Sequence, residues 1–413
     1  MSVLRMMVGV GAALSVWATA AEAQDKKFAG RGIDPKIVAA YEKLGGKYGG
    51  WVTQRIAGSN IKRFEFGAAA AKARLPGFFF ATELNTKPPI FRDTFPDPGV
   101  PFGIGFYQTL SNKNVKCLAD LKSLTFLQIT GDELTDAGLP ELAGLTNLTI
   151  LDLECRSMAG QGLKELAPLK KLSRLYLIGM ARSDAMLLSL REIGRLHAFS
   201  SAFGKNTSYY PPTQDAVVEL SLNHPAVSDD GLKALVPLKN LAVLDLSTSK
   251  VTDAGMKDVA SHKNLISLKL GRTEVSDAGL KELAPLSKLY LLDLTSTQVS
   301  DAGMKDLARL KSLSSLTLGR TNLTAAGLKG LSGLKNLTML NLHNTKITDD
   351  GLKDLAQLKK LTSLELTGTL MTKPGIAALR RALPKCMINP GSGERSISAD
   401  ACRGRVLGLR RGH

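Results

Sequence analysis

The apolar residues of this chain follow a pattern that returns every 24 residues. Each repeat contains a glycine at the same position, and the sequence around it is nearly constant, as in VTDAGMKDV and VSDAGLKEL. A fixed period of this length is typical of a protein built from stacked repeats. The glycines that keep the spacing are Gly138, Gly162, Gly231, Gly255, Gly279, Gly303, Gly327, Gly351 and Gly375.

Each repeat contains two kinds of periodicity. Leu268 and Leu270 alternate with polar residues and predict a short strand with one buried face. Leu280, Leu283 and Leu286 lie three residues apart and predict the buried face of a helix. A Ser/Thr-Asp pair precedes each glycine and supplies oxygens for the free amides of the first helical turn.

One such unit cannot fold alone. Burial of about seven apolar side chains gives ~10–20 kcal/mol, whereas ordering the backbone of one repeat costs ~24–48 kcal/mol. Stacking must supply the difference, with parallel strands on a concave side and helices on a convex side because helices need more room than strands. The predicted strands are 127–129, 151–153, 175–177, 220–222, 244–246, 268–270, 292–294, 316–318, 340–342 and 364–366, with a weaker one at 104–106.

The text L-x-x-L-x-L-x-x-T-x-V-T-D-A-G-L-K-x-L over residues 100–388 resembles bacterial leucine-rich repeat proteins, similar to the ribonuclease-inhibitor-like and F-box-associated subclasses. The resemblance implies an α/β fold, a curved solenoid with parallel strands on the concave face and helices on the convex face. It implies no particular ligand. Threonine replaces the usual Asn or Cys after the strand, so a hydroxyl must satisfy the turn, at Thr273, Thr297, Thr321, Thr345 and Thr369.

The first residues predict export. Arg5 precedes an apolar run and then Ala21-Glu22-Ala23, which indicates a signal peptide over 1–23, cleaved after Ala23. The run is shorter than the ~20 residues of a membrane-spanning helix. The expected location is therefore secreted or periplasmic, without membrane insertion after signal removal.

Residues 24–99 are expected to form an N-terminal cap. Asp34-Pro35 is a typical helix start, and Gly45-Gly46 a typical end. Nine of the thirteen phenylalanines fall between Phe64 and Phe106, and a compensating core is favoured over a binding patch. The array over 100–388 carries an insertion at about 187–217, and residues 389–413 are expected to be a disordered basic tail.

Charge and cysteine content change this picture little. The net charge of +17 is concentrated in the two ends rather than along the array. A disulfide between Cys386 and Cys402 is left open, and Cys155 is expected at the concave edge. No motif for metal, nucleotide or nucleophilic catalysis is present, so no cofactor is expected and an enzyme is the remote alternative.

The favoured function is a protein-binding scaffold that uses its concave face and the insertion. Aromatic and arginine side chains are the usual anchors of interfaces, and Lys269 is expected to neutralise a face that also carries carboxylates. The predicted binding residues are Tyr176, Tyr209, Tyr210, Lys269, Arg272, Asp293 and Arg320.

The rival function is binding of an anionic polymer, an envelope polysaccharide or nucleic acid, through lysine columns on the outer helices. One column contains Lys257, Lys281 and Lys305, but an acidic residue follows each of these lysines directly. An ordinary solvated helix face is therefore favoured over this site. The sequence does not indicate the oligomeric state.

Overall fold

The computed structural model describes residues 32–56, 59–66, 75–81, 94–108, 110–180, 182–198, 202–204 and 213–391. It divides into two compact units at Val217 and Val218, called unit 1 and unit 2 below. The predicted signal peptide, the chain beyond Gly391, Tyr209 and Tyr210 lie outside the described residues. No helix within the described ranges is both long and apolar enough to span a membrane.

Unit 1 contains a seven-stranded sheet with a mixed edge. The first two strands form an antiparallel hairpin, the first also pairs antiparallel with the third, and the remaining pairs are parallel. The order is β2-β1-β3-β4-β5-β6-β7. The strands are β1 (Lys47–Ile56), β2 (Ser59–Phe66), β3 (Leu75–Ala81), β4 (Phe102–Tyr107), β5 (Leu124–Thr130), β6 (Ile150–Glu154) and β7 (Arg174–Ile178).

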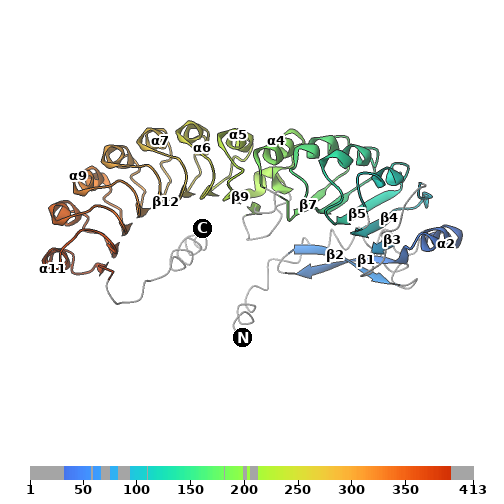
Figure 1. The fold of residues 1–413 in the computed structure, drawn as a ribbon, viewed down its shortest axis with the longest axis horizontal. Helices are drawn as coiled ribbons and strands as arrows, with labels where there is room; N and C mark the ends of the chain where they lie inside the picture. The colour runs from blue at the N-terminus through green and yellow to red at the C-terminus, as the bar shows by residue number, and fades with distance from the viewer. Residues whose placement is uncertain are drawn as a thin grey trace. The chain divides into compact units, whose positions relative to one another are not determined.

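Short helices cover one side of this sheet (Figure 1). Leu187 and Leu190 are buried in α4, so the helix of this coil extends into the segment that the sequence assigned to the insertion. The elements are α2 (Pro35–Lys43), η1 (Val115–Leu118), η2 (Asp136–Leu142), η3 (Gln161–Leu166), α4 (Asp184–Glu192), η4 (Leu196–Ala198), β8 (Ala202–Gly204) and η5 (Gln214–Ala216).

The first helix starts as the sequence predicts and closes an aromatic core. The Asp34 carboxylate accepts from the backbone N–H of Lys36 at 2.7 Å, and Pro35 occupies the first turn. Tyr41 is fully buried and stacks on Phe78 with ring centroids 3.9 Å apart. The phenylalanines of this region therefore form a core, and the buried ones are Phe78, Phe80, Phe95, Phe102 and Phe106.

Unit 2 repeats one coil with constant register. Each strand pairs in parallel with the next, and equivalent residues 24 apart lie directly opposite, as Leu268 and Leu292 do. The strands form the inner side of a curved stack and the helices its outer side (Figure 1). The strands are β9 (Val217–Ser221), β10 (Val243–Asp245), β11 (Ser267–Lys269), β12 (Leu291–Asp293), β13 (Ser315–Thr317), β14 (Met339–Asn341), β15 (Ser363–Glu365) and β16 (Met387–Asn389).

The helices of unit 2 are short, and several begin with a 3-10 turn. A strand, two turns and a helix must share 24 residues, which leaves most helices little more than one turn. They are α5 (Asp229–Leu232), η6 (Lys233–Leu235), η7 (Asp253–Gly255), α6 (Met256–Val259), α7 (Asp277–Glu282), η8 (Asp301–Gly303), α8 (Met304–Leu307), α9 (Ala325–Leu328), η9 (Lys329–Gly333), η10 (Asp349–Gly351), α10 (Leu352–Leu355) and the longer closing helix α11 (Lys373–Ala382).

The threonine after each strand satisfies the turn, as predicted. Its hydroxyl donates to the carbonyl three residues earlier, and the hydroxyls of the first four are buried. The donors and distances are Thr273 (2.6 Å), Thr297 (2.7 Å), Thr321 (2.7 Å), Thr345 (2.6 Å) and Thr369 (2.8 Å).

The aspartate before each glycine does not cap its own helix, which corrects the sequence-based interpretation. The Ser276 hydroxyl caps its helix by accepting from Ala278 N–H, whereas Asp253 accepts from the next coil. Asp253 receives the Ser276 N–H at 2.7 Å, its hydroxyl at 2.6 Å and the Gly279 N–H at 2.9 Å. We call this contact, in which the carboxylate accepts from the N–H and the hydroxyl of a Ser or Thr in the next coil, the aspartate rung. The same rung joins Asp229 to Thr252, Asp277 to Ser300, Asp301 to Thr324 and Asp349 to Thr372.

This aspartate rung explains the invariant glycine of the repeat. A Cβ on Gly279 would lie 2.5 Å from an oxygen of Asp253, and one on Gly303 would lie 2.4 Å from Asp277. The space of the missing side chain is thus filled by the carboxylate of the preceding coil. Glycine and aspartate are a matched pair across two coils.

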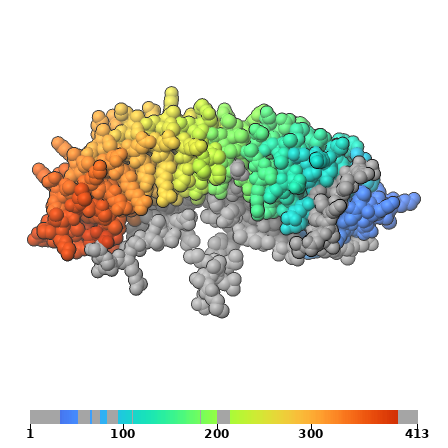
Figure 2. All heavy atoms as spheres, viewed as in Figure 1, coloured from blue at the N-terminus to red at the C-terminus, as the bar shows by residue number. Residues whose placement is uncertain are grey.

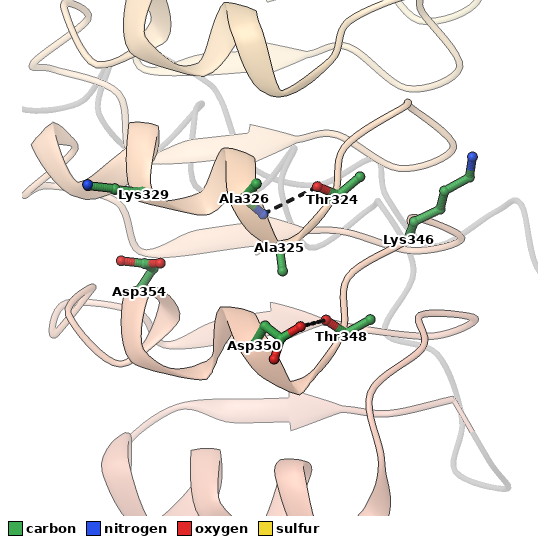
Figure 3. Close-up of a pocket in the computed structure, with 8 residues that line it drawn as sticks. All are labelled: Thr324, Ala325, Ala326, Lys329, Lys346, Thr348, Asp350 and Asp354. Carbon is green, nitrogen blue, oxygen red and sulfur yellow. Dashed lines mark hydrogen bonds between the residues drawn. The ribbon is translucent and has the colours of Figure 1, made fainter.

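Within the described residues of unit 2, the rung is interrupted at Ala325. An added Cβ on Gly351 would lie 2.4 Å from Leu328 Cδ1 and 3.6 Å from the Ala325 methyl, so no carboxylate of the preceding coil stands there. The Thr348 hydroxyl donates instead to Asp350 of its own coil at 3.1 Å. A surface hollow opens between the two coils at this point (Figure 3).

The cysteines differ from the expectation at one position. Cys155 is fully buried, and its thiol lies 3.9 Å from the Ile129 carbonyl, so it packs between coils rather than at the concave edge. The apolar leucine environment excludes water from this small side chain. Cys386 carries a free thiol.

A leucine on the inward side of a strand should contribute far more stability than its polar neighbour. Leu292 is fully buried, and we expect Leu292→Ala to lower the free energy of unfolding by ~2–5 kcal/mol. Asp293→Ala, which removes only hydrogen bonds to Thr295, should cost less than ~1 kcal/mol. Urea denaturation of both variants measures the difference, and equal losses would contradict the assignment of faces.

Repairing the broken rung should stabilise the array. We expect Ala325→Asp to raise the free energy of unfolding by ~1–2 kcal/mol, because the new carboxylate would accept from Thr348 in the room beside Gly351. Ala326→Asp is the matched control, since that exposed residue lies outside the rung. Thermal denaturation should show a higher Tm for the first variant only, and a decrease would contradict the role given to the rung.

Candidate functional site

The inner face of unit 2 is built by side chains that point away from the leucine core. Because the strands are parallel and in register, residues at one position of the coil form a column across the face. The central column is Asp245, Lys269, Asp293, Thr317, Asn341 and Glu365.

The carboxylates of this column are held by their own surroundings. Asp245 accepts from the Ser247 N–H at 3.0 Å and pairs with the Lys269 ammonium at 3.5 Å. Asp293 accepts from the Thr295 N–H and hydroxyl at 2.9 and 2.6 Å. Glu365 accepts likewise from Thr367 and from an adjacent Asn amide at 2.6 Å. The expected neutralisation by Lys269 is therefore present between β10 and β11.

Arg272 and Arg320 occupy left-handed backbone at the edge of the face. Their φ angles are +60° and +57°, and their N–H groups donate to the next coil, to Thr295 O at 2.7 Å and His343 O at 2.8 Å. This conformation continues the ladder beyond the strand and costs a non-glycine residue ~1–2 kcal/mol. Both side chains are exposed, and neither guanidinium has an ion pair or hydrogen bond within the described part of the chain.

Residues that follow the strands on the inner side also recur every second coil, at a spacing of 48 residues that the 24-residue repeat does not predict. Gly271-Arg272 recurs as Gly319-Arg320, while the coils between them carry larger polar groups at the glycine position, Thr295 and His343. The signal was visible in the sequence as the alternation of LGRT with other text. Small residues, Gly271 and Gly319, thus alternate along the face with larger ones, Thr295 and His343, and we call the glycine positions notches.

The two glycine notches differ in what fills them. A Cβ on Gly319 would lie 2.0 Å from the His343 ring, so this ring occupies the notch, with Nδ1 2.9 Å from the Asn341 side-chain oxygen. Burial lowers the pKa of His343, and Arg320 lowers it further. The nearest atoms to the same position on Gly271 are 3.5 Å away or more. A Cβ at Gly271 would therefore be in ordinary contact with its neighbours, and no side chain fills this position as the His343 ring does at Gly319.

The corresponding face of unit 1 is covered by an indole ring. Trp51, on β1, lies across the glycines of β3 and β4: a Cβ on Gly103 or Gly105 would lie 2.6 Å from its ring. Its ring centroid is 4.4 Å from that of Phe126. Tyr176 packs against the edge of this cluster and is partly buried. Of the predicted binding residues, Tyr176 thus serves a packing role in unit 1.

Asp152 lies beside this cluster, with its carboxylate 3.1 Å from the Gln128 amide nitrogen that donates to it. Burial raises its pKa to about 6, against the opposing effect of that hydrogen bond. Burial also raises the pKa of Tyr176, and the Asp152 charge adds to the increase. One acid in a mostly apolar place is a source of pH-dependent stability rather than a reactive centre.

The outer helices present the predicted lysine column. Lys257, Lys281 and Lys305 are exposed on the convex side, whose side chains form the upper rim of unit 2 in the space-filling view (Figure 2). Lys233 in the same column pairs with Asp230 at 2.6 Å. Within the described ranges, no group of three or more His, Cys, Asp or Glu side chains could hold a metal ion.

Comparison with known proteins agrees with the repeat assignment. Residues 311–371, which span β13 to β15, match the sequence family described as leucine rich repeat. No curated protein matches the chain. The molecule has the fold of a curved leucine-rich-repeat solenoid, with parallel strands on the inner side and helices on the outer side, as the sequence predicts.

Among the solved structures with similar repeats are three from two bacteria. An internalin of Listeria monocytogenes is 22% identical, with a TM-score of 0.45 over 71% of this chain and 73% of that one. A leucine-rich-repeat protein of Leptospira interrogans is 18% identical, with a TM-score of 0.38 over 72% and 93%. Internalin C2 of Listeria monocytogenes is 27% identical, with a TM-score of 0.35 over 45% and 77%.

Removing the charge of Asp152 should stabilise unit 1 at neutral pH. The native carboxyl has a pKa of about 6, above its ordinary 3.8, so stability should increase as the pH falls from 7 to 4 and the native state gains a proton. We expect Asp152→Asn to raise the free energy of unfolding by ~1–3 kcal/mol at pH 7 and to remove this pH dependence. Denaturation at several pH values measures both effects; a variant less stable at pH 7 would contradict the assignment.

Proposed function

We propose that the protein is an exported, non-enzymatic binding scaffold, and that a protein partner contacts the inner face of unit 2 around Arg272 and Arg320. The proposal of export rests on the predicted signal peptide 1–23, and that of a bacterial origin rests on the sequence of the repeat. A contribution of the 187–217 insertion with Tyr209 and Tyr210 stays a prediction.

The observation that carries the proposal is that two arginines stand exposed at the edge of the inner face without an ion pair among the described residues. Glycine is the favoured residue at φ near +60°, and Gly368 occupies this position in a later coil. A long charged side chain here adds no ion pair to unit 2 within the described residues, so fold stability does not explain it. The left-handed conformation itself belongs to the repeat, because Thr248, Ser296 and Asn344 share it, so the exposed arginine side chains and not the backbone mark the site.

The chemistry of the face favours binding over catalysis. Its carboxylates are held by hydrogen bonds from their own or adjacent coils, and Lys269 is paired with Asp245. A rigid sheet that presents fixed charges and two guanidiniums suits recognition of a folded partner, because arginine forms directional bonds with carboxylates. Lys269 and Asp293 would then surround the contact as polar neighbours.

Loss of the two arginine side chains should weaken binding without weakening the fold. We expect Arg272→Ala with Arg320→Ala to weaken binding of the natural partner by ~2–4 kcal/mol in total. Arg272→Gly should bind as weakly as Arg272→Ala yet be equally or more stable, because glycine relieves the positive φ. Affinity capture from extracts of the source organism, followed by titration of the captured protein and by thermal denaturation, measures both.

The matched control removes positive charge from the outer helices. Lys257→Ala, Lys281→Ala and Lys305→Ala together should leave partner binding unchanged. Binding that survives the arginine changes and disappears with the lysine changes would contradict the proposal and favour the anionic-polymer alternative instead.

A further inference from the structure

An apolar row crosses the inner face of unit 2 at the start of the strands. Val243, Leu291, Met339 and Met387 stand at one position of alternate coils, and serines occupy the coils between them. Ser267 and Ser315 are only 4% and 8% exposed because their larger neighbours flank them, while Met387 at the end of the row is 60% exposed. The result is a line of apolar side chains two coils apart.

The arginine row runs parallel to this apolar row. Arg272 and Arg320 are likewise two coils apart, about 9.5 Å at the usual strand spacing. Leu291 and Ser296, which stand in the two rows, are five residues apart, at most about 17 Å, and the last of these residues form a turn with φ +57° at Ser296 that shortens the distance. The face is therefore a strip with one apolar edge and one cationic edge, each repeating at the same interval.

An α-helix has the dimensions of this strip. Its diameter with side chains is about 10–12 Å, and seven residues advance it by about 10.5 Å. One edge of a helix that lies along the stack would place every seventh residue near one member of a row. A β-strand brings a residue to the same face about every 6.8 Å and does not match the interval.

Backbone chemistry and charge agree with a helical occupant. The N–H groups at the edge of the face, such as those of Arg272, Ser296 and Arg320, already donate to the next coil, so recognition falls to side chains. A helix satisfies its own backbone in the same way. The Arg272 and Arg320 guanidiniums are exposed along one edge of the face, so the edge of the occupant that lies against them is acidic.

We propose that the inner face of unit 2 binds an acidic, amphipathic α-helix of a partner protein. Leucine-like residues seven apart pack on Val243, Leu291 and Met339, and Asp or Glu residues seven apart pair with Arg272 and Arg320. This inference rests on the proposed function and names the partner segment at the same site.

The test uses synthetic peptides and the full chain. The probe is a three-heptad helical peptide with Leu along one edge and Glu at every seventh position along the other. Two peptides of equal length and equal net charge serve as comparisons: one with the Glu residues five apart, and one with the same number of Glu residues in a proline-rich, extended sequence. Fluorescence anisotropy measures each Kd.

The heptad peptide should bind at least tenfold more tightly than either comparison. Arg272→Glu with Arg320→Glu should weaken it at least tenfold, and a peptide with Lys in place of Glu should restore binding to this variant. Leu291→Ser with Met339→Ser should weaken the original peptide, whereas Val236→Ser, an exposed apolar residue after η6, should not. Thermal denaturation confirms that the variants are folded.

Preferential binding of the extended peptide, or failure of charge reversal to restore binding, would overturn the helical proposal. Its failure is distinguishable from failure of the proposed function. If the natural partner still depends on Arg272 and Arg320 while no heptad peptide binds, the scaffold function stands and the helix assignment is wrong.

Discussion

The register between neighbouring coils is the constraint on which the rest of unit 2 depends. One coil buries too little apolar surface to fold, so its leucines must meet those of the next coil at one alignment. Two sets of bonds define that alignment: the strand ladder on the inner side and the aspartate rung, such as Asp253 to Ser276, at the start of each helix. Because the register is constant, equivalent surface residues of successive coils form a straight column. The residues that stand in these columns determine the chemistry of the binding face.

Most of the fold could be predicted from the sequence because the repeat is local. Leu268 and Leu270 define a strand face, and Thr273 closes the turn with its hydroxyl as expected. The first helix, from Pro35, was likewise readable from its Asp-Pro start. The local pattern could not show that the aspartate bonds to the next coil rather than to its own helix. Asp253 and Ser276 are 23 residues apart, and only the stacked structure brings them together.

The same limit applies to the candidate site. Arg272, Lys269 and Asp293 could be placed on the inner face from strand alternation, and the Lys269–Asp245 pair followed from strand order. The half-buried position of Tyr176 could not be predicted from its own strand, because it depends on Trp51, more than a hundred residues away, whose ring packs over Gly103 and Gly105; its role in binding stays a prediction. Glycines at outward strand positions were the available signal that a large ring covers this part of unit 1. The positive φ of Arg272 and Arg320 could be inferred only by comparing coils, because Asn344 and Gly368 hold the same position in later repeats.

The central claim is that a partner occupies the inner face of unit 2 rather than its outer helices. Hydroxyl-radical footprinting of the full chain, with and without its captured partner, tests this directly by mass spectrometry, because it reports the solvent accessibility of individual side chains. We expect protection of Leu291, Met339 and Arg272, with unchanged labelling of exposed residues away from the inner face, such as Val236 and Lys305. Protection confined to the outer helices, with Leu291 and Met339 labelled as in the free protein, would contradict it.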